Sequence, residues 1–378
     1  MAAYIAGVVL FALGIAVTIA LHEAGHLVAA RTFGMRVRRY MIGFGPEVWA
    51  KTVGTTRYGV CAVPLGGFCE IAGMTALDPV TEEEAPHAMR TKPRWQRVVV
   101  LAGGIVMNLL IGFSILYGVA VTSAIPNPYA DRTAVVGAVV PDSPAQRAGL
   151  AQGDRILAID GVAQDSFLDV RDTVRTLPGR TVEFDVERAG RRIGVDVAIS
   201  GGASGTVGLV GASVPDAVRS FGPVEAVPAT ARYTGEILAS TVRAVAQLPA
   251  KVPGVVAAIF GAERDQEGPM SVVGASRVGG ELVERSLWDV FWMMLASLNF
   301  FLALFNLIPL PPFDGGHIAV VAWEWVRDKV RAVRGLAPAG PADYTKLLPV
   351  TYVVGAALLA LGVVVIVADV VNPVRLFG

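Results

Sequence analysis

The sequence has little cysteine and no excess of charge of either sign. Only two of its 378 residues are cysteines, Cys61 and Cys69. Two cysteines are too few for a disulfide framework, and we interpret both as packing residues. Lysine and arginine together number 32, as do aspartate and glutamate, so the formal net charge is zero. A nucleic-acid-binding protein needs a basic face, and this balance argues against a nucleic-acid partner.

Charge is also missing from long stretches of the chain. No charged residue lies between Ala2 and Leu21, and about 20 apolar residues are enough for a helix to span a bilayer. No basic segment precedes this run, and the run is too long for the apolar core of a signal peptide, so we interpret it as a retained span. With 53% hydrophobic residues, the chain is predicted to be an integral membrane protein in contact with the lipid bilayer.

Four stretches have the length and composition of transmembrane helices. We predict them within residues 1–32, 98–125, 288–317 and 347–372. Basic residues collect in segments 33–97 and 318–346, which the positive-inside rule places in the cytoplasm. Both termini and the large segment between the second and third spans are then extracytoplasmic. The chain is expected to be a multi-pass protein of the inner or plasma membrane.

Segment 33–97 contains a predicted β-hairpin. Gly43-Phe44-Gly45-Pro46 and Pro64-Leu65-Gly66-Gly67-Phe68 supply glycine and proline turns, and residues 56–62 alternate as a strand does. Its apolar content predicts that the hairpin returns toward the membrane, where protein or a water-filled cavity must cover it. Such a hairpin has an edge to which an extended peptide can add as a strand. The alternative is a surface hairpin that only packs against the helices.

Residues 133–213 have the pattern of an inserted α+β domain. A strand is predicted over Val135–Val140, followed by a short helix between the N-cap Ser143 and Gly149. The run Ser143–Gly161 resembles a PDZ domain, a fold that binds extended peptides, often C-termini, by strand addition. The alternative is a spacer or size filter. The remaining predicted elements are a strand ending at the Asp160-Gly161 turn, a helix near Phe167–Arg175, strands Thr181–Arg188 and Arg192–Ile199, and a groove strand with Gly208, Leu209 and Val210.

Residues 214–287 are predicted to form a partly amphipathic helical linker along the outer membrane surface. Within it, Pro269–Ala275 stands out from its surroundings without an assigned role.

Two of the only four histidines form the string His22-Glu23-Ala24-Gly25-His26 at the end of the first span. Residues i and i+4 share a helix face, so both imidazoles can bind one Zn²⁺. Glu23 then lies beside the metal, where it can act as general base on a bound water. Ionisable groups at membrane depth cost roughly 2.5 kcal/mol or more each and usually mark function. The alternative is a polar helix end that reaches the headgroup layer.

A catalytic zinc usually has three protein ligands and an open position for water. The first and third spans both run from outside to inside, so the third ligand is expected where the third span ends. Asp314 is the only acid between Asn306 and Gly316. Two alternatives remain open, namely that Asp314 caps the following helix or that His317 is the ligand. Asn306 can donate to a developing oxyanion, hold a substrate backbone, or bond to another helix.

Together, HExxH in the first span, NxxPxPxxDGG in the third, the GFG-type hairpin and the inserted PDZ domain resemble the site-2 protease family of intramembrane metalloproteases. The closest likeness is to the bacterial single-PDZ type that cleaves anti-sigma factors. The resemblance implies hydrolysis of peptide bonds in or near transmembrane segments of single-span membrane proteins. We hypothesise in addition that the PDZ domain restrains access, so that only substrates already trimmed outside reach the active site. The direction of the first span places that site near the cytoplasmic side.

The resemblance assigns roles to individual residues. It implies one zinc per chain bound by His22, His26 and Asp314, with Glu23 as catalytic base and Asn306 at the active site. A substrate strand would pair with the hairpin. The hairpin residues concerned are Gly43, Phe44, Gly45, Pro64, Gly66 and Gly67. One departure concerns the second span, where relatives often carry a Gly-Pro pair shortly before an asparagine, whereas Gly104-Ile105-Val106-Met107 precedes Asn108 here.

Two other functions fit parts of the sequence. A non-catalytic membrane adaptor would use the PDZ domain to bind peptide C-termini, and the HExxH residues and Asp314 would then be unrelated structural groups. A zinc transporter or sensor would need polar groups along several spans, and the second and fourth spans have very few.

Overall fold

The computed structural model of the chain describes residues 1–75, 77–130, 133–201, 208–209, 212–213, 216–265 and 268–374. It divides into two compact units. The first, here the membrane unit, comprises Met1–Leu116 and, within the described chain, residues 234–374. The second, here the PDZ-like unit, comprises residues 117–233 of the chain.

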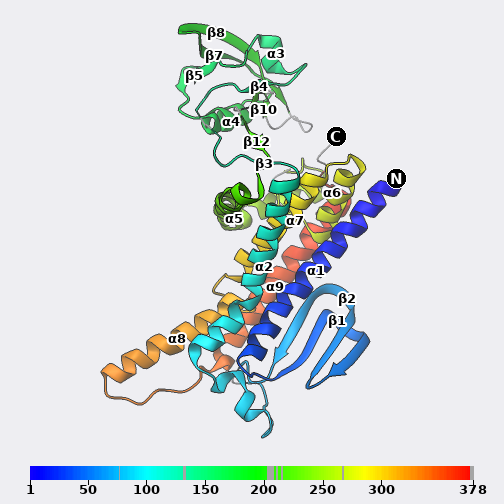
Figure 1. Cartoon of the computed structure of the whole chain (residues 1–378), viewed down its shortest axis with the longest axis vertical. Helices are drawn as coiled ribbons and strands as arrows, with labels where there is room; N and C mark the ends of the chain where they lie inside the picture. The colour runs from blue at the N-terminus through cyan, green and yellow to red at the C-terminus, as the bar shows by residue number, and fades with distance from the viewer. Residues whose placement is uncertain are drawn as a thin grey trace. The chain divides into compact units, whose positions relative to one another are not determined.

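Long apolar helices dominate the membrane unit (Figure 1). They are α1 (Ala2–Thr32), α2 (Arg94–Thr122), α7 (Trp288–Asn306) and α9 (Leu348–Val371), and each is long and apolar enough to cross a membrane. The predicted class, a helical membrane protein with a β-hairpin and an α+β insert, is confirmed. The third-span helix ends at Asn306, before Pro309, Pro311 and Pro312, because proline cannot continue a helix interior.

A fifth long helix, α5 (Pro223–Ile259), lies in the segment predicted as a linker. By length and composition it too is able to cross a membrane. Within the membrane unit, however, α5 is seen almost along its axis in Figure 1, whereas α1 and α7 run across the view. Its last turns pack Val255 against Val365 and Ala368 at the end of α9.

Residues Pro269–Ala275 join α5 to α6 (Val272–Glu284) and to the end of α9. Asp369 of α9 is fully buried and accepts hydrogen bonds from the Ser271 amide (2.6 Å) and from Nη2 of Arg264 (2.9 Å). Ser271 also caps α6, since its Oγ accepts from the Gly274 amide. The segment that stands out in the sequence is therefore a junction that holds one end of α9.

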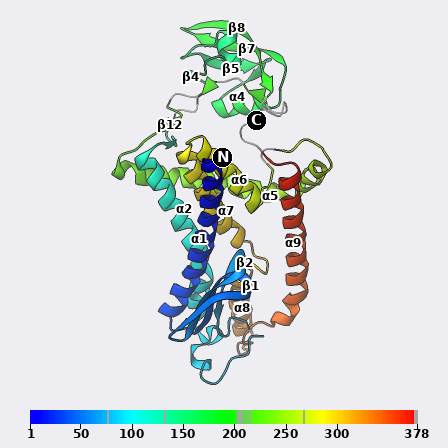
Figure 2. The same cartoon turned by 90° about the vertical axis from the view of Figure 1, so that its right-hand side faces the viewer.

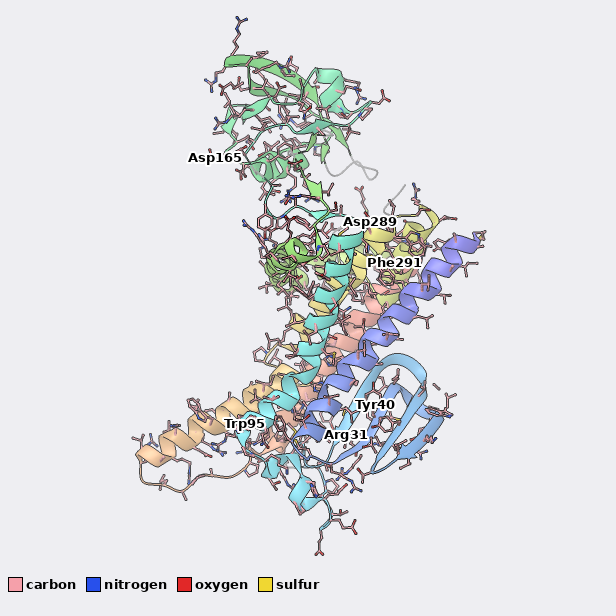
Figure 3. All side chains as sticks on the ribbon, in the orientation of Figure 1. Arg31, Tyr40, Trp95, Asp165, Asp289 and Phe291 are labelled. Carbon is pink, nitrogen blue, oxygen red and sulfur yellow. The ribbon has the colours of Figure 1, made fainter. Side chains whose placement is uncertain are left out.

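The hairpin consists of β1 (Val37–Val53) and β2 (Thr56–Ile71), which pair antiparallel. Both strands bend back, so that Met41 lies opposite Gly59 on one side and opposite Phe68 on the other. The last part of β2 thus becomes an edge, and the sheet lies beside α1 in both views (Figures 1 and 2). Tyr40, labelled in Figure 3, donates from its hydroxyl to the Ala20 carbonyl of α1 at 2.5 Å. Cys61 and Cys69, both in β2, are free.

Two ion pairs connect α8 (Asp314–Val333) to the start of α2, and the pair of Arg97 with Glu324 is buried. Arg97 Nη1 donates to Glu324 Oε2 at 2.6 Å, and the side chains are 6% and 2% exposed. One turn further along α8, Asp328 pairs with Arg94. Removing one partner of a buried ion pair strongly destabilises the fold, because the remaining charge is then buried without compensation. They therefore fix the direction in which α8 leaves the site.

The PDZ-like unit contains a four-stranded antiparallel sheet, in the order β6 (Val162–Ala163), β5 (Arg155–Ile159), β7 (Thr181–Arg188) and β8 (Arg191–Ala198). Its apolar core lies around Ile156, Phe184 and Val197, all buried. The predicted helix α4 spans Phe167–Arg175 and the predicted short helix α3 spans Pro144–Ala148. The strands are β3 (Ile125–Pro126), β4 (Ala138–Val139), β5 (Arg155–Ile159), β6 (Val162–Ala163), β7 (Thr181–Arg188), β8 (Arg191–Ala198), β9 (Ser200–Gly201), β10 (Gly208–Leu209), β11 (Ala212–Ser213) and β12 (Val218–Arg219).

Local signals explain most of these elements. Ser143 Oγ accepts from the Gln146 amide at the start of α3, and Gly149 ends that helix with φ of 81°. The strand predicted over Val135–Val140 is shorter, since β4 covers two residues and Val135 makes only an isolated bridge to Arg155. Gly208 and Leu209 form β10, which pairs with β9 and lies against α4. Val210 lies outside the described residues.

Candidate active site

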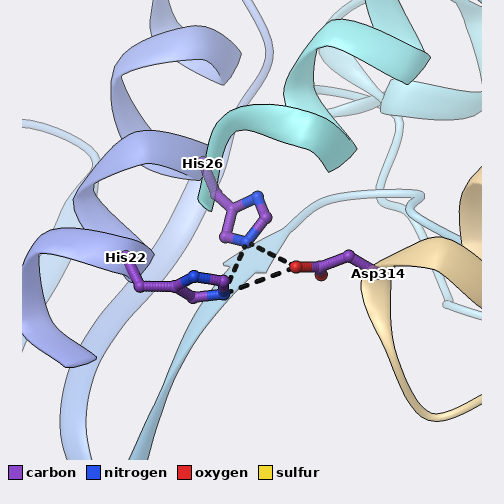
Figure 4. Close-up of side chains that lie close together, drawn as sticks. All are labelled: His22, His26 and Asp314. Atoms are coloured by element: carbon purple, nitrogen blue, oxygen red, sulfur yellow. Dashed lines mark hydrogen bonds and ion pairs between the residues drawn. The ribbon is translucent and has the colours of Figure 1, made fainter. Parts of the chain in front are cut away.

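His22 and His26 project from one face of α1 toward Asp314 (Figure 4). Their spacing of four residues brings the two Nε2 atoms within 3.4 Å of each other. Both imidazoles are largely buried, with side chains 12% and 9% exposed. The two histidines thus share one face of α1, as their spacing predicts.

Asp314 is the first residue of α8, and the preceding residue, Phe313, is its N-cap. The alternative in which Asp314 caps this helix is therefore wrong. Its Oδ2 lies 3.4 Å from Nε2 of both His22 and His26. The next residue has to be glycine, because a Cβ on Gly315 would lie 2.3 Å from the Leu307 carbonyl oxygen. This close approach turns the chain from the end of α7 back toward α1.

The three donor atoms form a triangle with equal edges of 3.4 Å. Zinc binds histidine nitrogen and carboxylate oxygen at about 2.0–2.2 Å, so neighbouring ligands of a tetrahedral site lie about 3.3–3.6 Å apart. The triangle thus matches one face of a tetrahedron and leaves the fourth position open. In the described part of the chain, Asp314 Oδ2 has no hydrogen-bond partner. These residues fit a zinc ion.

A second contact prepares His26 for metal binding. Its Nδ1 lies 2.8 Å from the Val100 carbonyl oxygen of α2. A carbonyl only accepts, so Nδ1 must carry the proton and Nε2 presents its lone pair to the other ligands. Metal-binding histidines commonly have such a partner, which fixes both tautomer and ring direction.

Glycines of α1 and α2 let these helices meet backbone to backbone beside the histidines. A Cβ on Gly25 would lie 2.2 Å from the Gly103 carbonyl oxygen. A Cβ on Gly104 would lie 2.5 Å from His26 Nε2 and 2.6 Å from His22 Nε2, two of the three atoms that would hold the metal. Gly104 is a site residue that the sequence analysis did not identify. The only signal was the Gly103-Gly104 pair in an apolar span, whose partner cannot be read from the sequence.

Glu23 points toward the hairpin edge. Its Cγ would lie 3.1 Å from a Cβ placed on Gly67, and its carboxylate faces the backbone of Cys69. Glycine at position 67 thus allows the edge strand to lie directly against the HExxH turn of α1. The hairpin and the three metal-site residues are thereby parts of one site.

The other predicted hairpin residues shape the bend of the sheet. Gly43 and Gly45 have φ of 91° and 84°, conformations that favour glycine. Gly66 lies against the Phe44 ring, which stacks on Phe68 with 6.2 Å between centroids. Pro64 lies in β2.

Asn306 and His317 are the two remaining predicted candidates. Asn306 is the half-buried last residue of α7. His317 turns away from the triangle, and its Nδ1 lies 3.5 Å from the Tyr344 hydroxyl. Within the described residues, His22, His26 and Asp314 are the one group of three histidine, cysteine or acidic side chains close enough to share a metal.

The chain belongs to Peptidase family M50, whose profile matches residues 10–339 and so includes both motifs. It is an intramembrane zinc metalloprotease. Among its relatives is the zinc metalloprotease Rip1 of Mycolicibacterium smegmatis, 43% identical with 98% of each chain covered. Zinc metalloprotease Rip1 of Mycobacterium tuberculosis (strain ATCC 25618 / H37Rv) is 42% identical, with 99% of each chain covered.

Among solved structures, the chain is similar to the PDZ domain of an SdrC-like protein from Listeria monocytogenes. The identity is 26% and the TM-score 0.21, and the match covers 23% of this chain and 90% of that one.

Proposed function

We propose that the protein hydrolyses peptide bonds in or near transmembrane segments of single-span membrane proteins, with its zinc held by His22, His26 and Asp314. The observation that carries the proposal is the 3.4 Å triangle of donor atoms, two of them on the apolar helix α1. Zinc in this position supplies Lewis acidity and lowers the pKa of a water molecule toward neutrality.

The remaining chemistry falls to the chain's own side chains. Glu23, the neighbour of His22, accepts the proton of the attacking water and delivers it to the leaving amine. Asn306 donates its amide hydrogen to the developing oxyanion. A substrate helix keeps its carbonyls in internal hydrogen bonds, so it must unwind locally before attack. The edge of β2 at Gly67 lies next to Glu23 and offers the unwound segment a strand to pair with.

The substrate class and the topology extend this proposal. The substrate is a single-span anti-sigma factor whose extracytoplasmic part has already been removed. Both termini are extracytoplasmic, the site lies near the cytoplasmic side, and the PDZ-like unit excludes untrimmed substrates. A peptide C-terminus binds this unit at the predicted groove strand of Gly208, Leu209 and Val210, of which the first two form β10 beside α4. Support comes from the basic segments 33–97 and 318–346 and from the contact of β10 with α4.

Substitution Glu23→Gln tests the catalytic proposal. We expect a loss of cleavage of about 10²-fold or more with zinc content unchanged, because the proton acceptor is removed and the ligands remain. Glu284→Gln, an exposed acid of α6, is the matched control and should cleave like the parent protein. Full cleavage by Glu23→Gln would contradict the assignment of the base.

Removal of residues 133–213 tests the gating proposal. The shortened protein should cleave an untrimmed anti-sigma factor that the full chain leaves intact. If both proteins require the same trimming, the PDZ-like unit does not control access.

A further inference from the structure

Asn108 is a polar residue in the middle of the apolar helix α2 that the catalytic proposal leaves without a role. Its side chain is 1% exposed. Neither Oδ1 nor Nδ2 has a hydrogen-bond partner among the described residues. A buried amide with neither donor nor acceptor paired is costly, and most buried polar groups are paired. A hydrogen-bond partner for this amide must therefore come from outside the described chain, for example from a bound substrate.

The position of Asn108 on α2 says where that partner would lie. Gly104, one turn earlier, faces the Nε2 atoms of His22 and His26. Gly112, one turn later, faces Phe300 of α7, since a Cβ there would lie 2.7 Å from the Phe300 ring. Residues four apart share a helix face, so Asn108 lies on the face of α2 that looks between α1 and α7.

The lean of helical side chains brings the amide closer to the metal ligands. Side chains on an α-helix tilt toward its N-terminus and cover the preceding turn. For Asn108 the preceding turn is that of Gly104, which has no side chain to fill it. This general tilt directs the amide toward the turn of Gly104, which borders the two histidines.

A second buried asparagine is bonded through its Nδ2 alone, since its Oδ1 has no hydrogen-bond partner among the described residues. Asn299 of α7 is fully buried, and its Nδ2 donates to Thr18 Oγ1 at 3.2 Å and to the Leu295 carbonyl at 2.9 Å. Asn299 thus ties α7 to α1. Asn108 makes no comparable bond within the described chain, although it is equally buried.

We infer that Asn108 is a substrate-positioning residue that holds the main chain of the unwound substrate beside the zinc. Nδ2 donates to a substrate carbonyl, and Oδ1 accepts from a substrate amide. Each residue of an extended polypeptide has one N–H donor and one C=O acceptor. A carboxamide has both an acceptor oxygen and an NH₂ donor, so it can pair with both groups. The inference rests on the proposed peptide-bond hydrolysis. It adds α2 to the elements that contact the substrate.

The test measures substrate binding apart from catalysis. The full-length Glu23→Gln protein in detergent is titrated with a fluorescent peptide that spans the cleavage region of a membrane substrate, and Kd is determined with and without Asn108→Leu. Zinc content and Tm are measured on the same samples. Leucine is close in size to asparagine and removes both unpaired groups, so the fold should not lose stability. We expect Kd to rise at least about tenfold, with zinc retained and Tm equal or higher.

Asn299→Leu is the matched control, because it removes an asparagine that has a structural bond. We expect a lower Tm and a Kd close to that of the Glu23→Gln protein. Asn108→Ala is the second variant and should weaken binding in the same way if leucine is too bulky. Unchanged Kd in both Asn108 variants would overturn the inference. So would a fall in Tm that matches Asn299→Leu without a change in Kd, since that result indicates a helix-packing role. Failure of the proposed hydrolysis would instead appear as a parent protein without zinc or as cleavage by Glu23→Gln.

Discussion

Gly104 of α2 lies so close to His26 of α1 that a Cβ at position 104 would be 2.5 Å from the Nε2 atom of His26. The metal site therefore requires glycine at position 104 as well as the side chains of His22, His26 and Asp314. It also depends on the backbone contact between Gly25 and Gly103, which brings α2 to this distance.

Substitution Gly104→Ala tests this dependence. The added methyl group would lie too close to the Nε2 atoms of both His22 and His26 and would displace these two imidazoles, so we predict the loss of most bound zinc and of cleavage. Gly118→Ala is the control on the same helix, because a Cβ there meets nothing within 4 Å. That control should keep its zinc and gain roughly 0.5–1 kcal/mol in stability, as expected for Gly→Ala in a helix. Zinc content by atomic spectroscopy decides between the two outcomes. Full zinc in Gly104→Ala would show that α2 does not border the metal.

The buried pair of Arg97 and Glu324 gives a prediction about the position of Asp314. Substitution Glu324→Gln leaves the Arg97 charge buried without its partner, at a cost of about 3–5 kcal/mol. Because Asp314 begins the same helix, we predict weaker zinc binding together with a lower Tm. The double variant Arg97→Met/Glu324→Leu removes both charges and should recover most of the stability. A Glu324→Gln protein with the parent's Tm would contradict the structural role of the pair.

Asp154 gives the PDZ-like unit a pH dependence of known sign. Burial alone would raise the pKa of this carboxyl, but hydrogen bonds from Arg188 (2.6 and 2.7 Å) and from the Ala151 amide (2.8 Å) outweigh it and lower the pKa. A lowered folded-state pKa stabilises the fold above the unfolded value, about 3.9 for aspartate. This contribution is lost as the pH falls through 3.9 toward the folded-state pKa.

Hydrogen exchange of β5 amides measures this effect. Protection should fall below pH 4 in the parent protein, and Asp154→Asn should weaken protection at pH 7 and remove that part of the pH dependence. Equal protection in both proteins at pH 7 would contradict the assignment.

Much of the site could be predicted from the sequence because its elements are local. The spacing of His22 and His26 fixes a shared helix face. Asp314 follows from the direction of the spans, since two helices that run the same way place their ends at the same depth. The helix predicted near Phe167–Arg175 is α4, and it begins after Ser166, which forms a capping box with Asp169.

What the sequence did not provide depends on contacts between distant elements. The role of Gly104 arises only when α2 crosses α1 at Gly25. The double pairing of Met41 requires both hairpin strands to bend, and periodicity along one strand does not report such a bend. The full length of α5 was also missed, because its apolar residues are interrupted by proline, glycine and alanine, which obscure the helical period.

The most direct test of the central claim is the zinc content of the detergent-purified protein beside His22→Ala and Asp314→Ala. A shared site predicts about one zinc per chain in the parent and a large loss in both variants, because three protein ligands are the usual minimum for a catalytic zinc. Glu23→Gln, prepared alongside, should retain the metal. A parent protein without zinc, or zinc that persists in Asp314→Ala, would contradict the claim that α1 and α8 hold one metal between them.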